Sequence, residues 1–330
     1  MAIEFKRIRS VTRLLNPFKG FTADEIPFEI RFDPLTGQTG HIFDLPYTPP
    51  KVPDIGEIVK RSREIPCPFC PDVVETSTPL FPESLIPEGR LRVGEAVLVP
   101  NLLPLDRYTG VCVMSPKHHM GMEEFTPETM RDAFTAAVQF AGRVAEADTG
   151  VRFFNINWNY MPQAGSSMVH PHIQVNCGDV PTNQLRVQMD ASRAYLDENG
   201  ANFWEDYLTT ERKAKERYVG AFGAVHWVLN FVPLSIMPDL CCIFPAQDSL
   251  LGFRDQDIHD FLEGLTRALK YIQGEGFSSF NMSLFSTRQD PAFRVNARVC
   301  PRTLIREIGN SDYTYYQALH REPCTHRTPA

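Results

Sequence analysis

Hydrophobic residues recur along this chain with two periods, one helical and one typical of strands. Two long segments carry an apolar face at helical spacing. The first, which the N-cap sequence Thr126-Pro127-Glu128 opens, comprises Phe134, Val138, Ala141 and Ala145. The second comprises Ile258, Phe261, Leu262, Leu265, Leu269 and Ile272. We therefore predict one amphipathic helix in each half of the chain.

Short runs rich in β-branched and aromatic residues surround both helices and predict strands. In the first half they lie at 96–100, 110–115, 151–158 and 168–176; in the second half they lie at 227–233, 240–244, 277–285 and 292–300. The polar stretch 182–215 has helical spacing with a break at Asn199-Gly200, and it predicts a helical connector. Residues 17–90 are rich in proline and glycine and predict irregular arms and short strands.

The two halves resemble each other in sequence. The segment 114–118 aligns with 243–247, each just before a helix, and 154–157 aligns with 280–283. Fifteen residues separate Asn155 from His170 and also Asn281 from Asn296, so that Gln247, Asn296 and Arg298 stand for His118, His170 and His172. With chance similarity as the alternative, we predict a duplicated strand–helix–strand unit with one active copy. Its parts would be an active half at 1–180, a helical connector at 181–220 and a degenerate half at 221–330.

Composition narrows the classes of function. The chain has 330 residues, 43% of them hydrophobic, and a net charge of −7 without a basic stripe, which argues against nucleic acid as a partner. No apolar run is long enough to predict a membrane span, and the N-terminal residues lack the apolar core of a secretion signal. Eight cysteines are few for this length and suit a reduced, cytoplasmic protein with a metal site better than a disulfide framework.

The sequence Cys67-Pro68-Phe69-Cys70 has the spacing of a metal-binding knuckle. Two thiolates across two residues can bind one Zn²⁺, which usually takes four tetrahedral ligands. The sequence contains no second such pair, so we expect the other ligands to be His118 or His119 together with His170 or His172. A redox or incidental cysteine pair is the alternative, but no thioredoxin-like βαβ pattern surrounds it.

The sequence His170-Pro171-His172-Ile173-Gln174 points to chemistry on a phosphate. On a strand, the side chains of His170, His172 and Gln174 share one face. Upstream, Asn159 and the small-residue run 164–167 provide a loop where the backbone could approach an anion. One imidazole could attack phosphorus through a phosphoramidate intermediate, both could bind a metal, or both could be solvated strand residues.

Five segments together resemble the galactose-1-phosphate uridylyltransferase branch of the histidine-triad superfamily, over about residues 28–323. The most specific one combines Asn159, Gly165 and Ser167 with 170–174, because five functional positions keep the family's spacing. The others resemble the family's N-terminal segment, zinc knuckle, nucleotide-contacting segment and Ser-Pro-x-His zinc-ligand segment; they are 31–37, 67–70, 101–104 and 115–118.

The resemblance implies an α+β fold of duplicated histidine-triad-like units, with a mainly antiparallel sheet flanked by helices. It implies that His172 is the nucleophile that carries the nucleotidyl group, with Gln174 and Ser167 holding the phosphates. The implied ligands of a structural zinc are Cys67, Cys70, His118 and His170. Substrate contacts are expected from Arg31, Asn101, Asn159, Gly165, Ser166 and Arg298.

Departures from the family pattern refine this expectation. Gln174 stands where hydrolases of the superfamily place a third histidine, which favours a transferase or phosphorylase. The family's second metal site uses histidines of the second half, where this chain has Asn296-Ala297-Arg298, so no second metal is expected. The segments 41–49 and 306–322 lack the family's matching motifs, so the acceptor is expected to differ from galactose 1-phosphate.

These observations predict a nucleotidyltransferase of carbohydrate metabolism. An NDP-sugar or related nucleotide would donate NMP to His172, and a phosphorylated small molecule would collect it. One alternative is a phosphorylase of an NDP-sugar or dinucleoside polyphosphate that uses the same histidine. Another is a zinc-stabilised nucleotide-binding protein without turnover. The family resemblance is compatible with a homodimer, and the sequence does not indicate the base.

Overall fold

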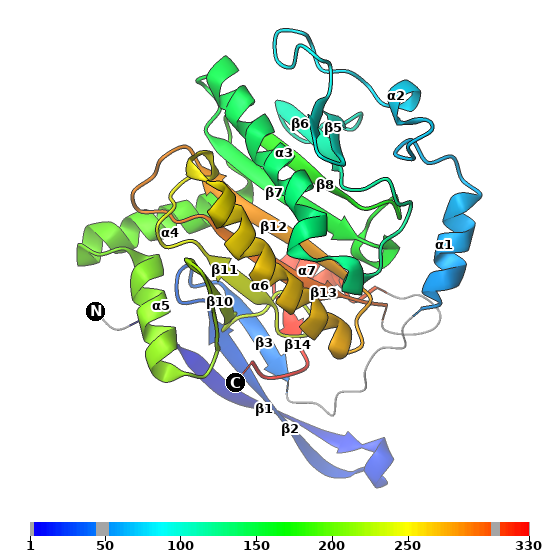
Figure 1. The fold of residues 1–330 in the computed structure, drawn as a ribbon. Coiled ribbons are helices and arrows are strands. Elements are labelled where there is room, and N and C mark those ends of the chain that lie inside the picture. The colour runs from blue at the N-terminus through cyan, green and yellow to red at the C-terminus, as the bar shows by residue number, and fades with distance from the viewer. Residues whose placement is uncertain (1–2, 44–52, 305–310, 330) are drawn as a thin grey trace.

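The computed structural model describes residues 3–43, 53–304 and 311–329. Within this part, strands form one ten-stranded and one four-stranded sheet, and helices cover the larger sheet (Figure 1). All the strand pairs of the larger sheet are antiparallel. The predicted α+β class with a mainly antiparallel sheet is therefore confirmed. The parts of the departing segments at 44–49 and 306–310 lie outside the described residues.

The ten-stranded sheet consists of two units of five strands that meet edge to edge. The N-terminal unit contains β4 (Leu91–Val93), β5 (Ala96–Pro100), β6 (Tyr108–Val113), β7 (Phe153–Tyr160) and β8 (His172–Gly178). The C-terminal unit contains β9 (Tyr218–Phe222), β10 (Val225–Leu229), β11 (Leu240–Ile243), β12 (Ser279–Thr287) and β13 (Asn296–Arg302). The order across the sheet is β4-β5-β6-β8-β7-β12-β13-β11-β10-β9, so both units have one topology and β7 pairs with β12 between them. The predicted duplication is confirmed.

Two long helices, α3 (Pro127–Ala147) and α6 (Asp255–Gly274), pack on one face of this sheet (Figure 1). Each follows the third strand of its unit. As predicted, α3 begins with Thr126 as N-cap and Pro127 at its first position; the Thr126 hydroxyl accepts a hydrogen bond from the Thr129 amide. Every second residue of β8 is fully buried in this core, namely Ile173, Val175 and Cys177. The residues between them therefore face the opposite, open side of the sheet.

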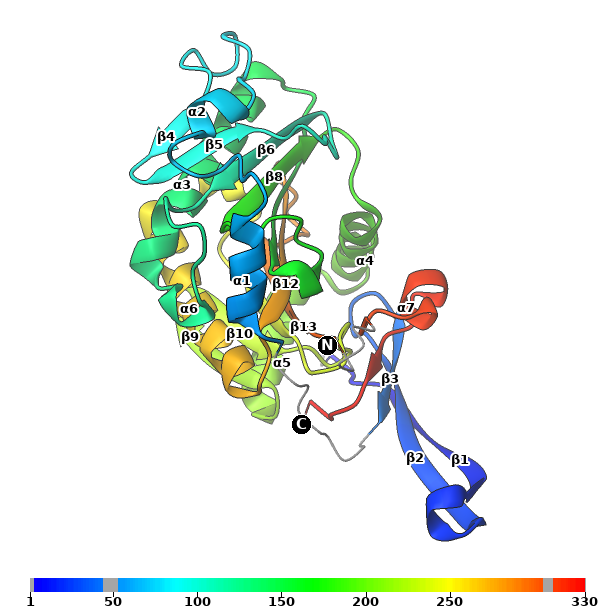
Figure 2. The ribbon, with the colours of Figure 1, turned by 90° about the vertical axis from the view of Figure 1, so that its right-hand side faces the viewer.

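The predicted helical connector forms α4 (Asn183–Asn199) and α5 (Phe203–Ala214). The break at Asn199-Gly200 ends α4, because Gly200 is its C-cap with a φ of 65°. In Figure 2, α4 lies on the opposite side of the sheet from α3 and α6. Both connector helices pack through Leu185, Phe203 and Tyr207 on apolar residues of the C-terminal unit, so they partly cover its open face.

The four-stranded sheet has the order β1-β2-β3-β14 and contains β1 (Arg7–Asn16), β2 (Thr22–Phe32), β3 (Thr39–Phe43) and β14 (Cys324–Thr325). The short helices are α1 (Ile55–Arg63), α2 (Val74–Ser77) and α7 (Tyr315–His320). No helix in the described ranges is long and apolar enough to cross a membrane.

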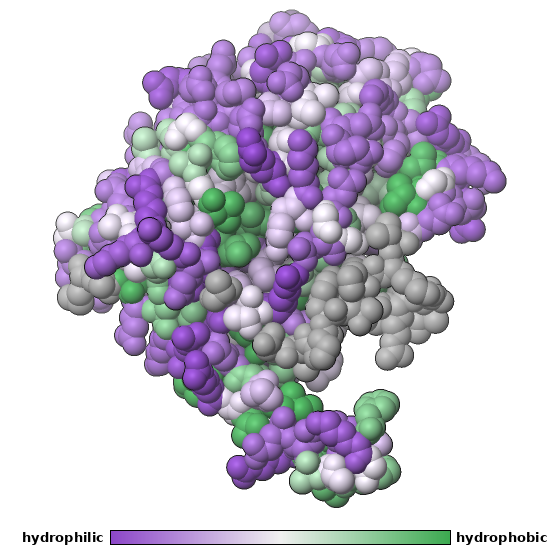
Figure 3. Space-filling model, turned by 60° about the horizontal axis from the view of Figure 1, so that its bottom comes forward, coloured by the Kyte–Doolittle hydropathy of each residue, from purple (hydrophilic) through white to green (hydrophobic). Residues whose placement is uncertain are grey.

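The long strand β2 corrects the prediction of irregular arms and short strands for residues 17–90, and it forms a hairpin with β1, for which the sequence predicted no strand. The two strands have ten and eleven residues, and the end of the hairpin stands clear of the body in Figures 2 and 3. Most of β1 is exposed on both faces, so no alternation of buried and exposed positions marks it in the sequence. At its tip the Phe18 side chain is 98% exposed, and hydrophobic and hydrophilic residues lie side by side.

Backbone pairing corrects the predicted alignment of the two halves by one residue at β11 and by two residues at β13. Val113 at the end of β6 pairs with His172, and Ile243 at the end of β11 pairs with Asn296. In each unit, the amide of the residue after the first member of this pair donates a backbone hydrogen bond to the carbonyl of the residue before the second member. Asn296 therefore corresponds to His172 and not to His170. The sequence alignment missed this because the chain between equivalent positions differs in length: His172 follows Asn157 by fifteen residues, but Asn296 follows the equivalent Ser283 by thirteen.

Candidate active site and metal centre

The four predicted metal ligands converge at one edge of the N-terminal unit. The ligand atoms of Cys67, Cys70, His118 and His170 all lie within 4.8 Å of one another. The Cys70 sulfur is 3.3 Å from His118 Nδ1, and the Cys67 sulfur is 3.6 Å from His170 Nδ1. Zinc bonds of about 2.3 Å to sulfur and 2.0 Å to nitrogen place tetrahedral ligands about 3.6 Å apart. The group therefore has the donor set and size of a tetrahedral metal site.

Hydrogen bonds hold the second nitrogen of each imidazole in this group. His170 Nε2 lies 2.8 Å from the Ser115 carbonyl, and His118 Nε2 lies 2.9 Å from the Ser62 hydroxyl. These contacts orient both rings so that Nδ1 faces the thiols. Of the two histidines left open by spacing alone, the structure brings His118 to the cysteines.

Burial sets the protonation states of this group. It lowers the pKa of His170 to about 4, against the opposing effect of the hydrogen bond to the Ser115 carbonyl. It raises the pKa of the Cys67 thiol to about 11, and the adjacent Cys70 adds to that rise. Neutral imidazole is the form that binds a metal, whereas a bound cation would favour the Cys67 thiolate.

His172 opens β8 on the open side of the sheet and is only 7% exposed. Its Nδ1 lies 2.8 Å from the carbonyl oxygen of His170. That carbonyl can only accept, so Nδ1 carries the proton and Nε2 keeps a free lone pair. Burial also lowers the pKa of His172, although the bond to the His170 carbonyl opposes the shift. The arrangement therefore favours a neutral imidazole with Nε2 available as a nucleophile.

Polar side chains continue across the open face from β8 to β12. Gln174 pairs with Asn157 of β7, and its side chain forms no hydrogen bond with any described residue. Asn157 accepts a 2.8 Å hydrogen bond from the Ser283 hydroxyl, and Asn159 accepts a 2.7 Å hydrogen bond from the Asn281 amide. The two units therefore share one polar surface, with Gln174 free to bind a ligand.

The predicted anion loop follows β7. Gly165 has a φ of 84°, which is in the left-handed region that favours glycine. Ser167 is exposed, whereas Ser166 is buried and donates to the Met168 carbonyl. The structure places Ser167 and Gly165 on the surface, and it assigns Ser166 an internal hydrogen bond.

Asn281 anchors this loop from the C-terminal unit. Its amide also donates a 2.8 Å hydrogen bond to the Ala164 carbonyl, and its oxygen accepts a 2.6 Å hydrogen bond from Arg302. Arg302 is in turn held by the carboxylate of Asp312 at 2.7 Å. Sequence analysis did not include Asn281 among the site residues, although its place in the repeat was a signal.

An apolar wall lies beside His172. The ring centroid of Phe69 is 5.2 Å from that of His172, and Phe69 packs on Val97, Val99 and Val111. Asn101 follows β5, and its side chain accepts a hydrogen bond from the Leu103 amide. The wall could hold a flat ring next to His172, a role that the sequence did not indicate for Phe69.

Two predicted substrate contacts lie apart from His172. Arg31 of β2 is fully buried and donates to Glu29 at 2.9 Å. Arg298 of β13 donates to Asp239 at 2.7 Å. These internal pairs engage both guanidinium groups, so the structure does not bring either one to His172.

No family model matches the sequence. An uncharacterized protein from Archaeoglobus fulgidus is 30% identical over 322 residues, which cover 97% of this chain and 94% of that protein. Among solved structures, a GalT-like protein from Arabidopsis thaliana has a TM-score of 0.68 at 17% identity. That comparison covers 91% of this chain and 95% of the plant protein.

Two further solved structures are similar. An ADP-glucose phosphorylase from Arabidopsis thaliana with bound ADP-glucose has a TM-score of 0.68 at 16% identity, covering 91% of this chain and 95% of that chain. A uridylyltransferase has a TM-score of 0.65 at 19% identity, covering 91% and 94%. These likenesses confirm the predicted fold. The chain therefore belongs to one family with the Archaeoglobus fulgidus protein and has the fold of the GalT-like protein, the ADP-glucose phosphorylase and the uridylyltransferase.

Proposed function

We propose that the protein is a nucleotidyltransferase that moves an NMP group from an NDP-sugar or related nucleotide to a phosphorylated acceptor. The observation that carries this proposal is the 2.8 Å contact between His172 Nδ1 and the His170 carbonyl. It fixes the tautomer in which Nε2 is the nucleophile. The His170 side chain belongs to the four-ligand group, so one residue connects the metal centre to the nucleophile. The fold shared with an ADP-glucose phosphorylase and a uridylyltransferase supports the same reaction class.

In the first step, the Nε2 lone pair of His172 forms a bond to the α-phosphorus of the donor. The bond between that phosphorus and the departing phosphate oxygen breaks, and the leaving group takes the electron pair. The Nδ1 proton stays on the ring, where the His170 carbonyl stabilises the positive charge of the adduct. The unpartnered amide of Gln174 and the exposed hydroxyl of Ser167 donate to the phosphoryl oxygens.

In the second step, an oxygen of the acceptor phosphate attacks the same phosphorus. The new P–O bond forms while the P–N bond breaks, and His172 regains its lone pair. Gln174 can donate to a phosphoryl oxygen but cannot take a proton from water at neutral pH. The adduct therefore waits for an anionic acceptor that needs no general base.

Zinc is the ion we propose for the four-ligand group. Two thiols and two Nδ1 atoms suit it, and four protein ligands leave no position for water or substrate. When bound, it would crosslink the knuckle to β8 and neutralise the thiolates. Cys67 and Cys70 would then hold Phe69 beside His172. The role of the ion would be structural.

The adduct can be sought by intact-protein mass spectrometry after separate incubations with UDP-glucose and ADP-glucose. We expect one UMP or AMP group per chain, stable in base and lost in acid. His172→Ala should abolish the adduct, whereas His259→Ala, which changes an exposed histidine of α6, should keep it. Turnover that survives in His172→Ala would overturn the mechanism.

The acceptor can be identified by chasing the isolated adduct. Release of the NMP group by a sugar 1-phosphate supports the transferase. Release of the NMP group by inorganic phosphate alone would show that the protein is a phosphorylase with the same nucleophile. Tight nucleotide binding without an adduct from either donor would indicate a binding protein without turnover.

A further inference from the structure

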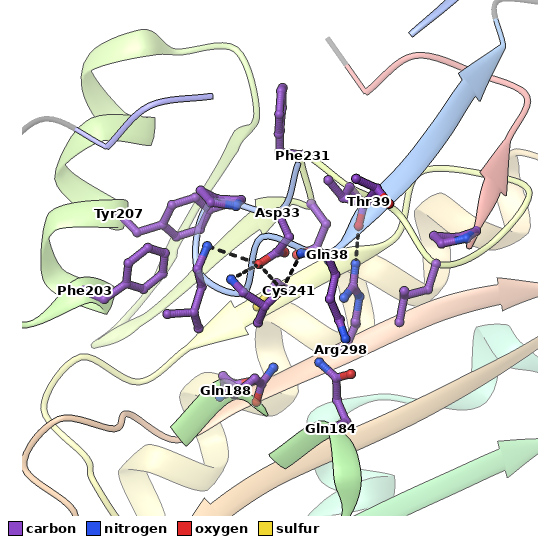
Figure 4. Close-up of a pocket in the computed structure, with 18 of the residues that line it drawn as sticks. Asp33, Gln38, Thr39, Gln184, Gln188, Phe203, Tyr207, Phe231, Cys241 and Arg298 are labelled. Atoms are coloured by element: carbon purple, nitrogen blue, oxygen red, sulfur yellow. Dashed lines mark hydrogen bonds between the residues drawn. The ribbon is translucent and has the colours of Figure 1, made fainter. Parts of the chain in front are cut away.

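A second pocket lies on the open face of the sheet, over the C-terminal unit (Figure 4). Its floor consists of Cys241 of β11 with Asn296 and Arg298 of β13. In Figure 4, Gln184 and Gln188 of α4 lie on one side, and Asp33, Gln38 and Thr39 around the turn between β2 and β3 lie on the other. Three strand spacings separate β13 from β8, so the floor lies about 14 Å from the His172 strand.

This floor is the counterpart of the active site in the duplicated fold. Asn296 corresponds to His172, and Arg298, which pairs with Ser283 of β12, corresponds to Gln174. The Asn296 amide donates a 3.1 Å hydrogen bond to the carbonyl two residues before it, as the His172 ring does. Asn296 therefore presents an amide oxygen in place of a nucleophilic nitrogen. Such a site can bind a ligand but cannot form the covalent adduct.

Several polar atoms of this pocket have no hydrogen-bond partner within the part of the chain that the structure describes. Gln188 is only 9% exposed, yet its Oε1 has no hydrogen-bond partner among the described residues. Arg298 uses Nε and Nη2 for internal bonds, so the N–H groups of Nη1 remain. Asp33 accepts three hydrogen bonds through Oδ1, so Oδ2 remains. Of these three groups, Gln188 Oε1 is the buried one, and a buried polar group without a partner is costly. Together the three groups offer both acceptors and a donor to a ligand.

Charge and size narrow the class of ligand. The charge of Arg298 is balanced by the fully buried Asp239. The lining contains one further acidic residue, Asp33, and one further basic residue, Arg321, so their charges cancel. A polyphosphate needs several uncompensated cations, which this lining does not offer. The inner cavity of about 60 Å³ adjoins a cavity of about 330 Å³ that shares Gln38, Gln184 and Arg321. The larger cavity lies at the lower end of the range for small-molecule sites, and the inner cavity is a small extension of it.

We propose that the pocket binds a polyhydroxylated ligand of monosaccharide size, as the non-reacting counterpart of the active site. Hydroxyl groups can donate to Gln188 Oε1 and Asp33 Oδ2 and accept from Arg298 Nη1. The rings of Phe203 and Tyr207 supply an apolar wall for the carbon face of a sugar. Arg321 would contact a phosphate where the ligand carries one. This site stands independently of nucleotidyl transfer.

Isothermal titration of the His172→Ala protein tests this proposal with glucose, galactose and their 1-phosphates, because that variant cannot turn over. We expect saturable binding of at least one sugar, weakened about tenfold by Gln188→Leu, the effect of one lost buried hydrogen bond. The matched control Gln139→Leu, at an exposed position of α3, should bind normally. Arg321→Ala should weaken only the 1-phosphates, which separates a sugar phosphate from a free sugar.

Hydrogen exchange on the same protein gives a readout that needs no pocket variant. A bound sugar should protect the amides of 33–39 and 183–188. Absence of binding by all four probes at millimolar concentration, or binding that Gln188→Leu leaves unchanged, would overturn the proposal. In the otherwise wild-type chain, Gln188→Leu should leave adduct formation at His172 unchanged. A failure of the sugar site is thereby distinguished from a failure of the proposed reaction.

Discussion

Asn281→Ala should impair chemistry in the N-terminal unit although Asn281 belongs to β12 of the other unit. The substitution removes three hydrogen bonds, of 2.7 Å to Asn159, 2.8 Å to the Ala164 carbonyl and 2.6 Å from Arg302. Each is partly buried, and each net contribution is about 0.5 to 1.5 kcal/mol, so we expect a loss of about 2 to 4 kcal/mol in the free energy of unfolding.

The bond to the Ala164 carbonyl is the one that positions the Gly165–Ser167 loop. If about 1.4 kcal/mol of transition-state stabilisation depends on it, adduct formation should slow about tenfold. Urea unfolding measures the first quantity, and single-turnover adduct formation with a nucleotide sugar measures the second. Ser283→Ala is the matched control on the same strand, because it removes only the 2.8 Å bond to Asn157 and should leave the rate nearly unchanged. Wild-type adduct kinetics in Asn281→Ala would refute the idea that the C-terminal unit orders the loop.

Four further predictions concern metal, specificity, stability and pH. Cys70→Ser should abolish the binding of one zinc per chain and lower the melting temperature, as metal analysis and calorimetry would show; an unchanged zinc content would contradict the assigned ligands. Gln174→His should speed the loss of the adduct to water, because a third imidazole supplies a general base; equal lifetimes in buffer would count against this role. Asp239→Asn should lower the free energy of unfolding by about 3 kcal/mol, since it leaves the Arg298 guanidinium without its carboxylate; a loss below about 1 kcal/mol in urea unfolding would contradict this. Burial lowers the pKa of His226 from its ordinary 6.5, so the folded state binds its proton less readily than the unfolded chain and loses stability as pH falls below that value; His226→Gln should lose less stability than the wild type between neutral pH and about pH 5, and an identical loss would contradict this.

Local sequence signals were sufficient to predict much of the fold. The helix at Pro127 and the break at Asn199-Gly200 were predicted because caps and glycine act within one turn. The convergence of Cys67, Cys70 and His170 was also predictable, because the Cys67/Cys70 spacing and the His170 motif are typical of ligands that share one metal site. The spacing alone did not decide between His118 and His119, because that choice depends on which ring reaches the cysteines in the fold.

Features that depend on distant contacts were not predictable in this way. The exposed strand β1 has no buried face to reveal it. The register between the units depends on the length of a connection, so sequence alignment paired Asn296 with the wrong histidine. Arg31 and Arg298 look like anion ligands in sequence, but both are engaged inside the fold. Arg31 pairs with Glu29 of its own strand and donates to the distant carbonyls of Phe231 and Pro329, and Arg298 pairs with Asp239. The repeat gave a signal for Asn281, but its contact with the loop after β7 depends on the pairing of β7 with β12, which the sequence does not specify.

The central claim is that His172 Nε2 carries the nucleotidyl group while Asn296 occupies the equivalent place without reacting. Tandem mass spectrometry of the proteolysed protein, after incubation with UDP-glucose or ADP-glucose, tests it most directly. The wild-type chain should carry UMP or AMP on His172, and His172→Asn, which copies the residue of the C-terminal unit, should carry none. A nucleotidyl group on any other residue, or wild-type turnover by His172→Asn, would contradict the account.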